Sequence, residues 1–453
     1  MSSSAIAPAL VLVCVSLLAG GAARADSFRK GPYLQSLNGQ GTVVMWESDD
    51  AQAGRVIVHP SIGPDLVIDE DKPVHMHEVR ISGLQPGKRY AYRVQTGGHE
   101  QGGEFATAPP PGEAFSFVVF GDTRSNAGAH KNVVERVRRE VPDFILATGD
   151  MVNEGTSAQD WQTFFDVERD LLHDNALYPA IGNHDREPRP ARTVENYRKY
   201  FAVPDDSPDP ERYYAFTYSN ARFLVLDSNL YSFALTDQTA WIERELTQAV
   251  QDARIRHIFV VMHHPPFSTS IHGGNGELRE MWTPLFEKYR VEAVFSGHDH
   301  TYEHCTHNGV QYLVSGGGGA PLYPKDPRAD KIDAAASRYF ERTYNFLRVQ
   351  VVGDFVEVAA VRDDGTLIES WGWGRMPEPV ARKAAPAASS HATAGASAAL
   401  AATNVAGGGK QATAGCSVAV GRSSDGRVAQ GAVGAAIVAL FVVLSRRRRS
   451  FAG

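Results

Sequence analysis

Short apolar runs separated by polar turns fill the part of the chain that follows residue 26. Residues 42–46 (TVVMW) and 89–94 (RYAYRV) are typical of strands, and Gln85-Pro86-Gly87 is a turn signal. Runs at this spacing, joined by polar turns, predict a small all-β sandwich over residues 26–110. The proline-rich segment at 109–112 is expected to stiffen the exit from this sandwich and to mark a domain boundary.

From residue 115 onward the pattern changes to apolar strands that alternate with amphipathic helices. Helical periodicity is clearest at residues 131–140 and 237–252. The apolar runs that predict strands are residues 115–120, 144–148, 177–181, 223–226, 257–262 and 291–295, followed by 310–315, 346–352, 355–361 and 366–370. This alternation predicts an α/β core over residues 113–378, with helices on the faces of a sheet.

The two ends of the chain have compositions of their own. An apolar run at residues 5–19 followed by Ala23-Arg24-Ala25 predicts a secretory signal peptide over residues 1–25, because the run is short for a membrane anchor. Residues 379–415 form an Ala/Ser/Gly-rich linker. In residues 416–453 an apolar run precedes four arginines, which predicts a membrane-spanning segment, with a disordered basic tail as the alternative. We therefore expect an exported protein of the cell envelope, at the outer surface or anchored in the membrane.

The net charge of −7 hides an acidic body. Residues 379–453 hold nine Lys and Arg against one Asp, and Arg24 adds one positive charge, so residues 26–378 carry −16. Nucleic acids are bound through basic surfaces, so this charge argues against a nucleic-acid partner. The three cysteines, Cys14, Cys305 and Cys416, imply no disulfide framework.

Motifs that carry chemistry lie where predicted strands end. They are Gly121-Asp122-Thr123-Arg124, Gly149-Asp150-Met151-Val152-Asn153, Gly182-Asn183-His184-Asp185, His263-His264-Pro265 and Gly297-His298-Asp299-His300. Each motif alone is compatible with a turn, a helix cap or an isolated histidine. Together they place two Asp, one Asn and three His at the strand ends where ligands of open α/β sheets bind.

A mixture of carboxylate, amide and imidazole ligands suits Zn, Mn or Fe better than a thiolate site would. We expect two divalent or trivalent metal ions, and Asp150 is expected to bridge them because paired sites hold cations roughly 3.5 to 4 Å apart. Because the body of the protein is acidic, a positive site for a phosphate group would have to come from such metals. The family resemblance described next implies a small phosphate ester as the substrate.

These motifs resemble, in kind and order, those of the calcineurin-like metallophosphoesterase superfamily. With the sandwich in front, and with residues 276–279 and 297–303, the chain resembles the purple acid phosphatase branch over about residues 28–370. The resemblance implies a four-layer α/β/β/α fold preceded by a fibronectin-III-like domain. It also implies that Asp122, Asp150 and His300 hold the first metal and that Asp150, Asn183, His263 and His298 hold the second.

The chain departs from this pattern at two positions. Arg124 stands where the superfamily often has a His ligand; a guanidinium cannot bind a metal, but it can clamp a phosphate oxygen. Asn153 stands where the purple branch has the Tyr that gives the colour, so we predict a colourless protein. Asn153 is left with two possible roles, as a weak metal ligand or as a partner of a metal-bound water.

The expected chemistry is in-line attack by a metal-bridging hydroxide. His184, paired with Asp185, is expected to protonate the leaving group or to hold the phosphate. His272 resembles a substrate-contacting His of the purple branch, with a solvated loop His as the alternative. His264 is expected to pack beside Pro265, and residues 316–319 (GGGG) to form a flexible turn beside the site.

The sequence thus predicts a hydrolase of phosphomonoesters that acts outside the cytoplasm. A phosphodiesterase acting on nucleotides or lipid head groups is the alternative within the same chemistry. An envelope binding or adhesion protein that has lost turnover is the alternative of another class. The C-terminal segment resembles the sorting signals of myxobacterial surface proteins, which implies processing or lipidation near Cys416. The sequence does not predict an oligomeric state.

Overall fold

The computed structural model describes residues 28–187, 193–205, 207–209, 212–229 and 235–376. The expected signal peptide (1–25), the linker (379–415) and the C-terminal segment (416–453) with Cys416 lie outside the described residues. Among the helices within the described ranges, none combines the length and the apolar character needed to cross a membrane.

The N-terminal part is an all-β domain, as predicted. Its first sheet contains β1 (Phe28–Asn38), β2 (Gly41–Gln52) and β5 (Val74–Ile81), and its second contains β3 (Arg55–Pro60), β4 (Leu66–Asp69), β6 (Arg89–Thr96) and β7 (His99–Ala106). Buried and exposed side chains alternate along β6, where Tyr90, Tyr92 and Val94 face the core. Period-two burial of this kind is typical of a sheet with one face on a core.

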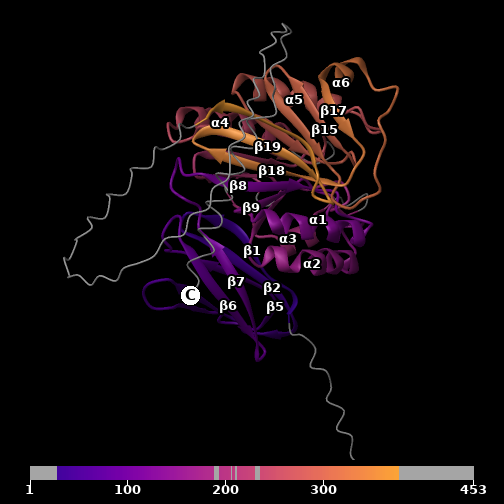
Figure 1. Cartoon of the computed structure of the whole chain (residues 1–453). Coiled ribbons are helices and arrows are strands. Elements are labelled where there is room, and N and C mark those ends of the chain that lie inside the picture. Colours follow the sequence, from indigo (N-terminus) through magenta and orange to yellow (C-terminus); the bar gives the residue numbers. More distant parts are fainter. Residues whose placement is uncertain (1–27, 188–192, 206, 210–211, 230–234, 377–453) are drawn as a thin grey trace, which may run out of the picture. The chain divides into compact units, whose positions relative to one another are not determined.

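One sheet crosses the boundary expected at residue 110. Strand β1 pairs in parallel with β10 (Ala176–Pro179), with Leu34 opposite Ala176. The result is a nine-stranded sheet in the order β20-β19-β18-β8-β9-β10-β1-β2-β5. The N-terminal strands therefore extend the sheet that supports the candidate site (Figure 1).

A seven-stranded sheet packs against the nine-stranded sheet. Its order is β11-β12-β13-β14-β16-β15-β17. Phe117 of β8, in the nine-stranded sheet, lies against Phe223, Phe259 and Phe295 of the seven-stranded sheet, with ring centroids 5.3 to 5.9 Å apart. The remaining strands of the two sheets are β8 (Phe115–Phe120), β9 (Phe144–Ala147), β11 (Tyr214–Tyr218), β12 (Ala221–Leu226), β13 (His257–Met262), β14 (Ala293–Ser296), β15 (Tyr302–His307), β16 (Val310–Ser315), β17 (Ser337–Glu341), β18 (Asn345–Val352), β19 (Asp354–Arg362) and β20 (Leu367–Arg375).

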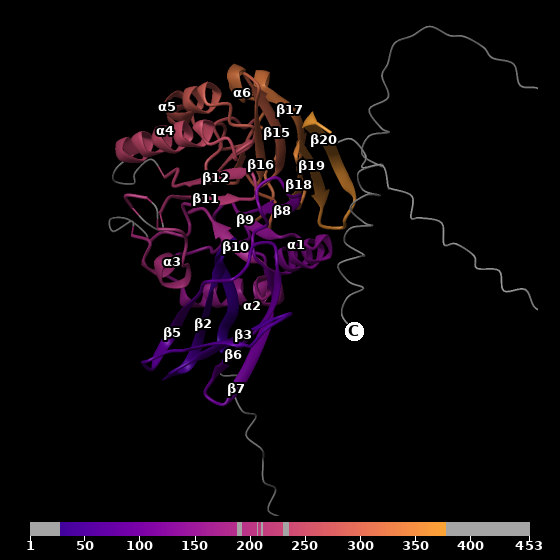
Figure 2. The same ribbon diagram turned by 90° about the vertical axis from the view of Figure 1, so that its left-hand side faces the viewer.

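Helices cover the outer faces of both sheets. Along β13, Phe259 and Val261 join the core between the sheets, whereas Ile258, Val260 and Met262 join a second core that also contains residues of the helices. Strands buried on both faces read as continuous apolar runs, which is why these runs were visible in the sequence. The helices are α1 (Ala127–Glu140), α2 (Ala158–Leu172), α3 (Glu195–Tyr200), α4 (Leu235–Gln251), α5 (Gly276–Lys288) and α6 (Lys331–Ala336). Figure 2 shows the predicted α/β/β/α layers, with α4 and α5 on one side and α1 and α2 on the other.

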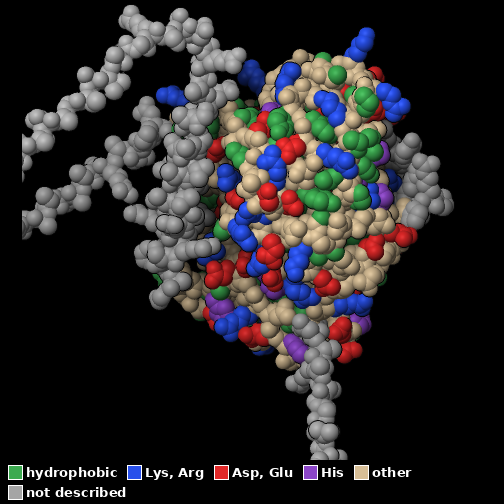
Figure 3. All heavy atoms as spheres, turned by 45° about the vertical axis from the view of Figure 1, so that its right-hand side comes forward, with side chains coloured by type: hydrophobic (Ala, Val, Ile, Leu, Met, Phe, Trp, Pro, Cys, Tyr) green, Lys and Arg blue, Asp and Glu red, His purple; other side chains and the backbone are tan. Residues whose placement is uncertain are grey.

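The layering brings the strand ends of both sheets to one place. Strands β8, β9 and β10 are parallel neighbours in the nine-stranded sheet, and β12, β13 and β14 are parallel neighbours in the seven-stranded sheet. Asp122, Asp150 and Asn183 follow the first set, and His263, His298 and His300 follow the second. On the outer surface, acidic and basic side chains are interspersed on the face shown in Figure 3.

Candidate metal centre

Three of the predicted ligands have a backbone conformation that side chains rarely adopt. Asp122 and Asp150 both have φ of 54°, and His298 has φ of 68°. A residue other than glycine in this left-handed region costs on the order of 1 to 3 kcal/mol and is often found at functional sites. The strain at these positions is held by the packing of the strand ends, and it aims the side chains inward.

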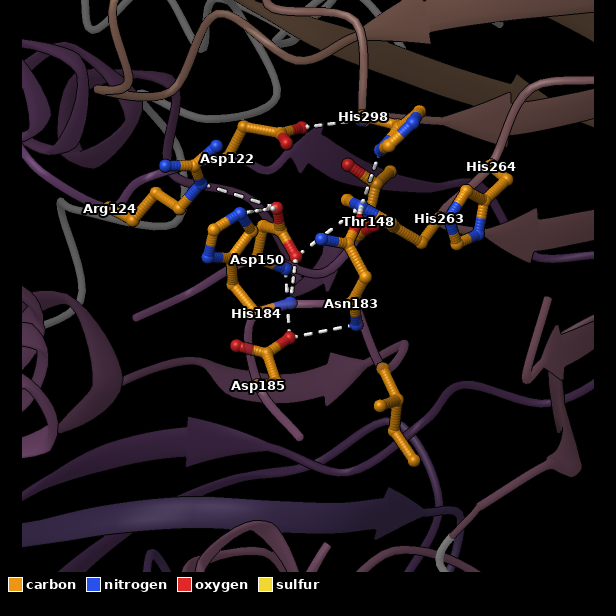
Figure 4. A network of polar contacts seen from close by, with 12 residues as sticks. Asp122, Arg124, Thr148, Asp150, Asn183, His184, Asp185, His263, His264 and His298 are labelled. Carbon is orange, nitrogen blue, oxygen red and sulfur yellow. Dashed lines mark hydrogen bonds and ion pairs between the residues drawn. The ribbon is translucent and has the colours of Figure 1, made fainter. Parts of the chain in front are cut away.

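The predicted ligands of the second metal surround His263. Its Nδ1–H donates to the carbonyl of Thr148 at 2.9 Å, which leaves a lone pair on Nε2. This nitrogen lies 3.1 Å from Asn183 Oδ1, 3.3 Å from Asp150 Oδ1 and 3.3 Å from His298 Nδ1. Ligands around one Zn ion at its usual bond lengths lie about 3.4 Å from each other, so these atoms fit a shared cation. Figure 4 shows the side chains turned toward one another.

The predicted ligands of the first metal are Asp122, Asp150 and His300. The His300 Nδ1–H donates to the carbonyl of Pro321 at 2.7 Å, so its Nε2 offers a lone pair 3.5 Å from Asp122 Oδ1. Among the described residues, Asp122 Oδ1 is buried and has no hydrogen-bond partner. A buried carboxylate oxygen without a partner is costly, and a cation at this position would satisfy it.

Buried charges surround the centre. Burial opposes ionisation of Asp150, but His263 and His184 hold the pKa of its carboxyl below the ordinary value. Burial, followed by the neighbouring His264 and His263, lowers the pKa of His298 well below its ordinary value. Burial lowers the pKa of His263, but Asp150 and Asp122 raise it above the ordinary value. A neutral imidazole and an ionised carboxylate are the forms that bind metals, so a cation bound here would take the place of a proton on His263.

The pairing expected between His184 and Asp185 is wrong. The His184 Nδ1–H donates to the carbonyl of Asn153 at 2.8 Å, and Nε2 lies 4.0 Å from Asp150 Oδ2. Asp185 is buried and accepts backbone N–H groups of Gly182, Asp150, Met151 and Val152 at 2.8 to 3.3 Å. Asp185 therefore fixes the loop that carries Asp150, and its carboxylate does not orient the imidazole.

The two departures from the family pattern lie side by side. The Oδ1 atom of Asn153 accepts from the Ser125 hydroxyl at 3.0 Å and from Arg124 Nη1 at 3.4 Å. Arg124 also donates from Nε to Asp150 Oδ2 at 3.2 Å, and its Nη2 lies 3.4 Å from His300 Nε2. In the structure, Asn153 thus bonds Arg124 and Ser125, while Arg124 reaches into the predicted first metal site.

His272 lies on an exposed loop at the mouth of the centre. Its ring centroid is 4.5 Å from that of His298 and 5.2 Å from that of Tyr323. The buried carboxylate of Asp299 holds this loop by accepting the His272 N–H at 3.2 Å and the Ser268 hydroxyl at 2.6 Å. His272 thus lies against the ring of one predicted ligand, His298.

Tyr323 was not anticipated at the centre, and His264 was expected only to pack beside Pro265. Tyr323 stacks on His300, with centroids 4.0 Å apart and an angle of 18° between the rings. His264 lies with His263 and His298 in a group whose ligand atoms are within 4.8 Å of one another. The Ser228 hydroxyl accepts the His264 backbone N–H at 2.9 Å and also lies 2.9 Å from the Nδ1 of its ring. The His-His dipeptide was a signal for His264, whereas no sequence pattern pointed to Tyr323.

The four-glycine segment is tightly packed, so the expected flexible turn is wrong. Gly318 N–H donates to the Gly121 carbonyl at 2.9 Å, and Ala320 N–H donates to the Asp122 carbonyl at 2.7 Å. A Cβ atom on Gly318 would overlap the Gly121 carbonyl oxygen. Glycine is required here because the segment lies directly against the loop that carries Asp122.

Comparisons with known proteins agree with this geometry. Residues 115–302 match the profile of the family described as Calcineurin-like phosphoesterase. An uncharacterized protein of Mycobacterium tuberculosis is 27% identical over 58% of this chain and 56% of its own length. Purple acid phosphatase 21 of Arabidopsis thaliana is 29% identical over 50% of this chain and 53% of its own length. The chain thus spans about half the length of these curated relatives.

The architecture also has a counterpart among solved structures. A purple acid phosphatase from yellow lupin seeds superposes with a TM-score of 0.67 at 18% identity, covering 76% of this chain and 75% of the lupin chain. At this identity the likeness concerns the fold. The family match, the relatives and the fold agree: residues 115–302 are similar to the Calcineurin-like phosphoesterase family, and purple acid phosphatases are among the proteins that the chain resembles.

Proposed function

We propose that this chain is a dinuclear metal-dependent phosphoester hydrolase that acts on small phosphomonoesters. The observation that carries the proposal is the convergence of six side chains that offer metal-ligand atoms. They follow strands of the nine-stranded and the seven-stranded sheet, and their ligand atoms face one another. These side chains are Asp122, Asp150, Asn183, His263, His298 and His300. The unsatisfied buried oxygen of Asp122 adds support, because it needs a positive partner.

The proposed assignment of ligands to the two cations follows the family resemblance and is supported by the distances between the ligand atoms. Asp122, Asp150 and His300 would hold one cation, and Asp150, Asn183, His263 and His298 the other. When bound, the cations would polarise the phosphoryl oxygens and lower the pKa of an attacking water. The side chains of this protein would hold the ester in line with that water and exclude competing orientations.

His184 is proposed to supply the proton to the leaving group. Its Nδ1–H is committed to the Asn153 carbonyl, so only Nε2 is available for proton exchange with a substrate. The imidazole side chain is 33% exposed at the edge of the centre. A leaving alkoxide beside Nε2 would take up the proton that this nitrogen holds.

The preference for monoesters is supported by those relatives whose names describe phosphatases, such as purple acid phosphatase 21. The purified full-length chain should be loaded with Zn²⁺, Mn²⁺ or iron and assayed with 4-nitrophenyl phosphate and bis(4-nitrophenyl) phosphate. We expect faster turnover of the monoester. Faster turnover of the diester would favour a phosphodiesterase. Bound metals without hydrolysis of either compound would favour a binding or adhesion protein.

We also propose that the protein is exported and displayed at the cell envelope. The apolar run with Ala23-Arg24-Ala25 at one end and the apolar run with four arginines at the other support this location. Terminal sequencing of the chain from a membrane fraction should give Asp26 as the first residue. A chain that retains residues 1–25 and stays in the cytosol would contradict the proposal.

A further inference from the structure

The guanidinium of Arg124 lies against two of the three predicted ligands of the first metal. Its Nε donates to Asp150 Oδ2 at 3.2 Å, and its Nη2 lies 3.4 Å from His300 Nε2. Because the other His300 nitrogen donates to Pro321, this Nε2 has a lone pair that the guanidinium can use. Arg124 therefore occupies lone pairs of Asp150 Oδ2 and His300 Nε2 that a cation in the first site would need.

The second metal site is not affected in the same way. Among the contacts of the described residues, those of Arg124 reach Asp150 and His300 but not Asn183, His263 or His298. The Asp150 oxygen that faces His263 is Oδ1, whereas Arg124 bonds Oδ2. The two oxygens of the Asp150 carboxylate thus face different neighbours, His263 at Oδ1 and Arg124 at Oδ2.

Arg124 is also held in place. Its side chain is only 12% exposed, and its Nη1 donates to Asn153 Oδ1 and to the Ser125 hydroxyl at 3.4 Å. Burial raises the pKa of the neighbouring Tyr323, and Arg124 opposes this rise. A guanidinium stays charged at any ordinary pH, so the first site has a permanent positive charge beside it.

We propose that Arg124 makes the two metal sites unequal, so that the first site binds a divalent cation at least ten times more weakly than the second. To occupy the first site, a cation has to displace the guanidinium from Asp150 Oδ2 and His300 Nε2. It then remains close to a like charge in a site largely shielded from water. This inference rests on the proposed function, because it takes the same six residues as the ligands.

Titration of the metal-free full-length chain with Zn²⁺ in a calorimeter tests the inference without any assay of activity. The wild type should show one tight class of site and one weak class. Arg124→Met removes the charge and the donors but keeps an unbranched, flexible side chain. It should tighten the weak class at least tenfold and leave the tight class within about threefold. Arg124→Lys, which keeps the charge, should leave the weak class weak.

Arg256→Met is a matched control, because Arg256 pairs with Asp354 on the surface and should not change either class. Circular dichroism and the melting temperature report whether each variant is folded, and Arg124→Gln replaces the Met variant if that one unfolds. Two equally tight classes in the wild type that do not change in Arg124→Met or Arg124→Gln would overturn the inference and leave the proposed function intact. A wild type that binds no Zn²⁺ would overturn both.

Discussion

The carboxylate of Asp122 accepts a hydrogen bond from the backbone N–H of His298, 2.9 Å away, although 176 residues of chain separate the two. Asp122 follows β8 in the nine-stranded sheet, and His298 follows β14 in the seven-stranded sheet. The bond therefore joins the strand ends of both sheets at the candidate centre. Each sheet supplies about half of the predicted ligands, so the centre depends on the packing between the sheets.

His184 should matter most for substrates with poor leaving groups. We expect His184→Ala to lower kcat for an alkyl phosphate roughly 100-fold or more, the usual contribution of general acid catalysis. 4-Nitrophenyl phosphate should be affected far less, because its leaving group needs little protonation. Steady-state kinetics with both substrates measure the difference, and the exposed His75→Ala is the control. Equal losses on both substrates would contradict the assigned role.

Gly318 should tolerate no side chain. Gly318→Ala pushes a methyl group into the Gly121 carbonyl and displaces the loop that carries Asp122. We expect a melting temperature lower by several degrees and weaker binding of metal, because strained packing typically costs about 1 to 3 kcal/mol. The control is Gly276→Ala at the start of α5, where a Cβ meets no atom within 4 Å. Similar melting temperatures for the two variants would count against the packed glycine segment.

The sequence predicted the strands that are apolar on both faces more readily than those with polar residues. Strands β8 and β13 have the bounds that their apolar runs predicted. Strand β1 was missed because Lys30, Gln35 and Ser36 interrupt it. These residues are buried by distant partners, such as Glu47 for Lys30 and the Ala202 carbonyl for Ser36. Pairings of this kind are tertiary and leave no local pattern in the sequence.

The difference between local and tertiary signals also explains which residues of the site could be predicted. The convergence of the six side chains could be predicted because a polar residue directly after a buried strand is a local signal. The role of Asp185 could not, because it bonds backbone N–H groups of a loop that precedes it by more than thirty residues. Tyr323 reaches His300 only because its segment folds back over the centre, with the Tyr323 N–H donating to the His300 carbonyl.

The pair of His257 and Glu292 should make stability depend on pH. Both ring nitrogens of His257 face acceptors at 2.8 Å, the Glu292 carboxylate and the Gly353 carbonyl, so the bonds require the protonated ring. Burial lowers the pKa of His257, but these partners raise it above the ordinary value of 6.5. The stabilisation is complete below that value and is lost as the pH rises through the folded-state pKa.

Glu292→Gln tests this pair. We expect the variant to lose roughly 1 to 2 kcal/mol of unfolding free energy at pH 6, because a hydrogen bond between charged groups is lost. At pH 9 the loss should be much smaller, since the wild-type ring is then neutral. Urea unfolding at the two pH values measures both losses. A loss that is the same at pH 6 and pH 9 would show that the ring is not charged in the folded protein.

The protein loaded with iron should be colourless. In the purple branch that the chain resembles, a Tyr at the position of Asn153 gives the colour, and here the Asn153 oxygen accepts from Ser125 and Arg124. Visible absorption spectra of the iron-loaded wild type should therefore lack the corresponding band. Asn153→Tyr should introduce it and Asn153→Phe should not. A purple wild type would refute this prediction.

Asp150 contributes to both predicted metal sites, so its replacement tests the central claim most directly. The wild type and Asp150→Ala should be loaded at saturating Zn²⁺, and bound metal and turnover of 4-nitrophenyl phosphate should be measured on the same samples. We predict about two metal ions per wild-type chain, as expected for a paired site, and loss of both metals and of activity in the variant. Full metal content and full activity in Asp150→Ala would contradict the account.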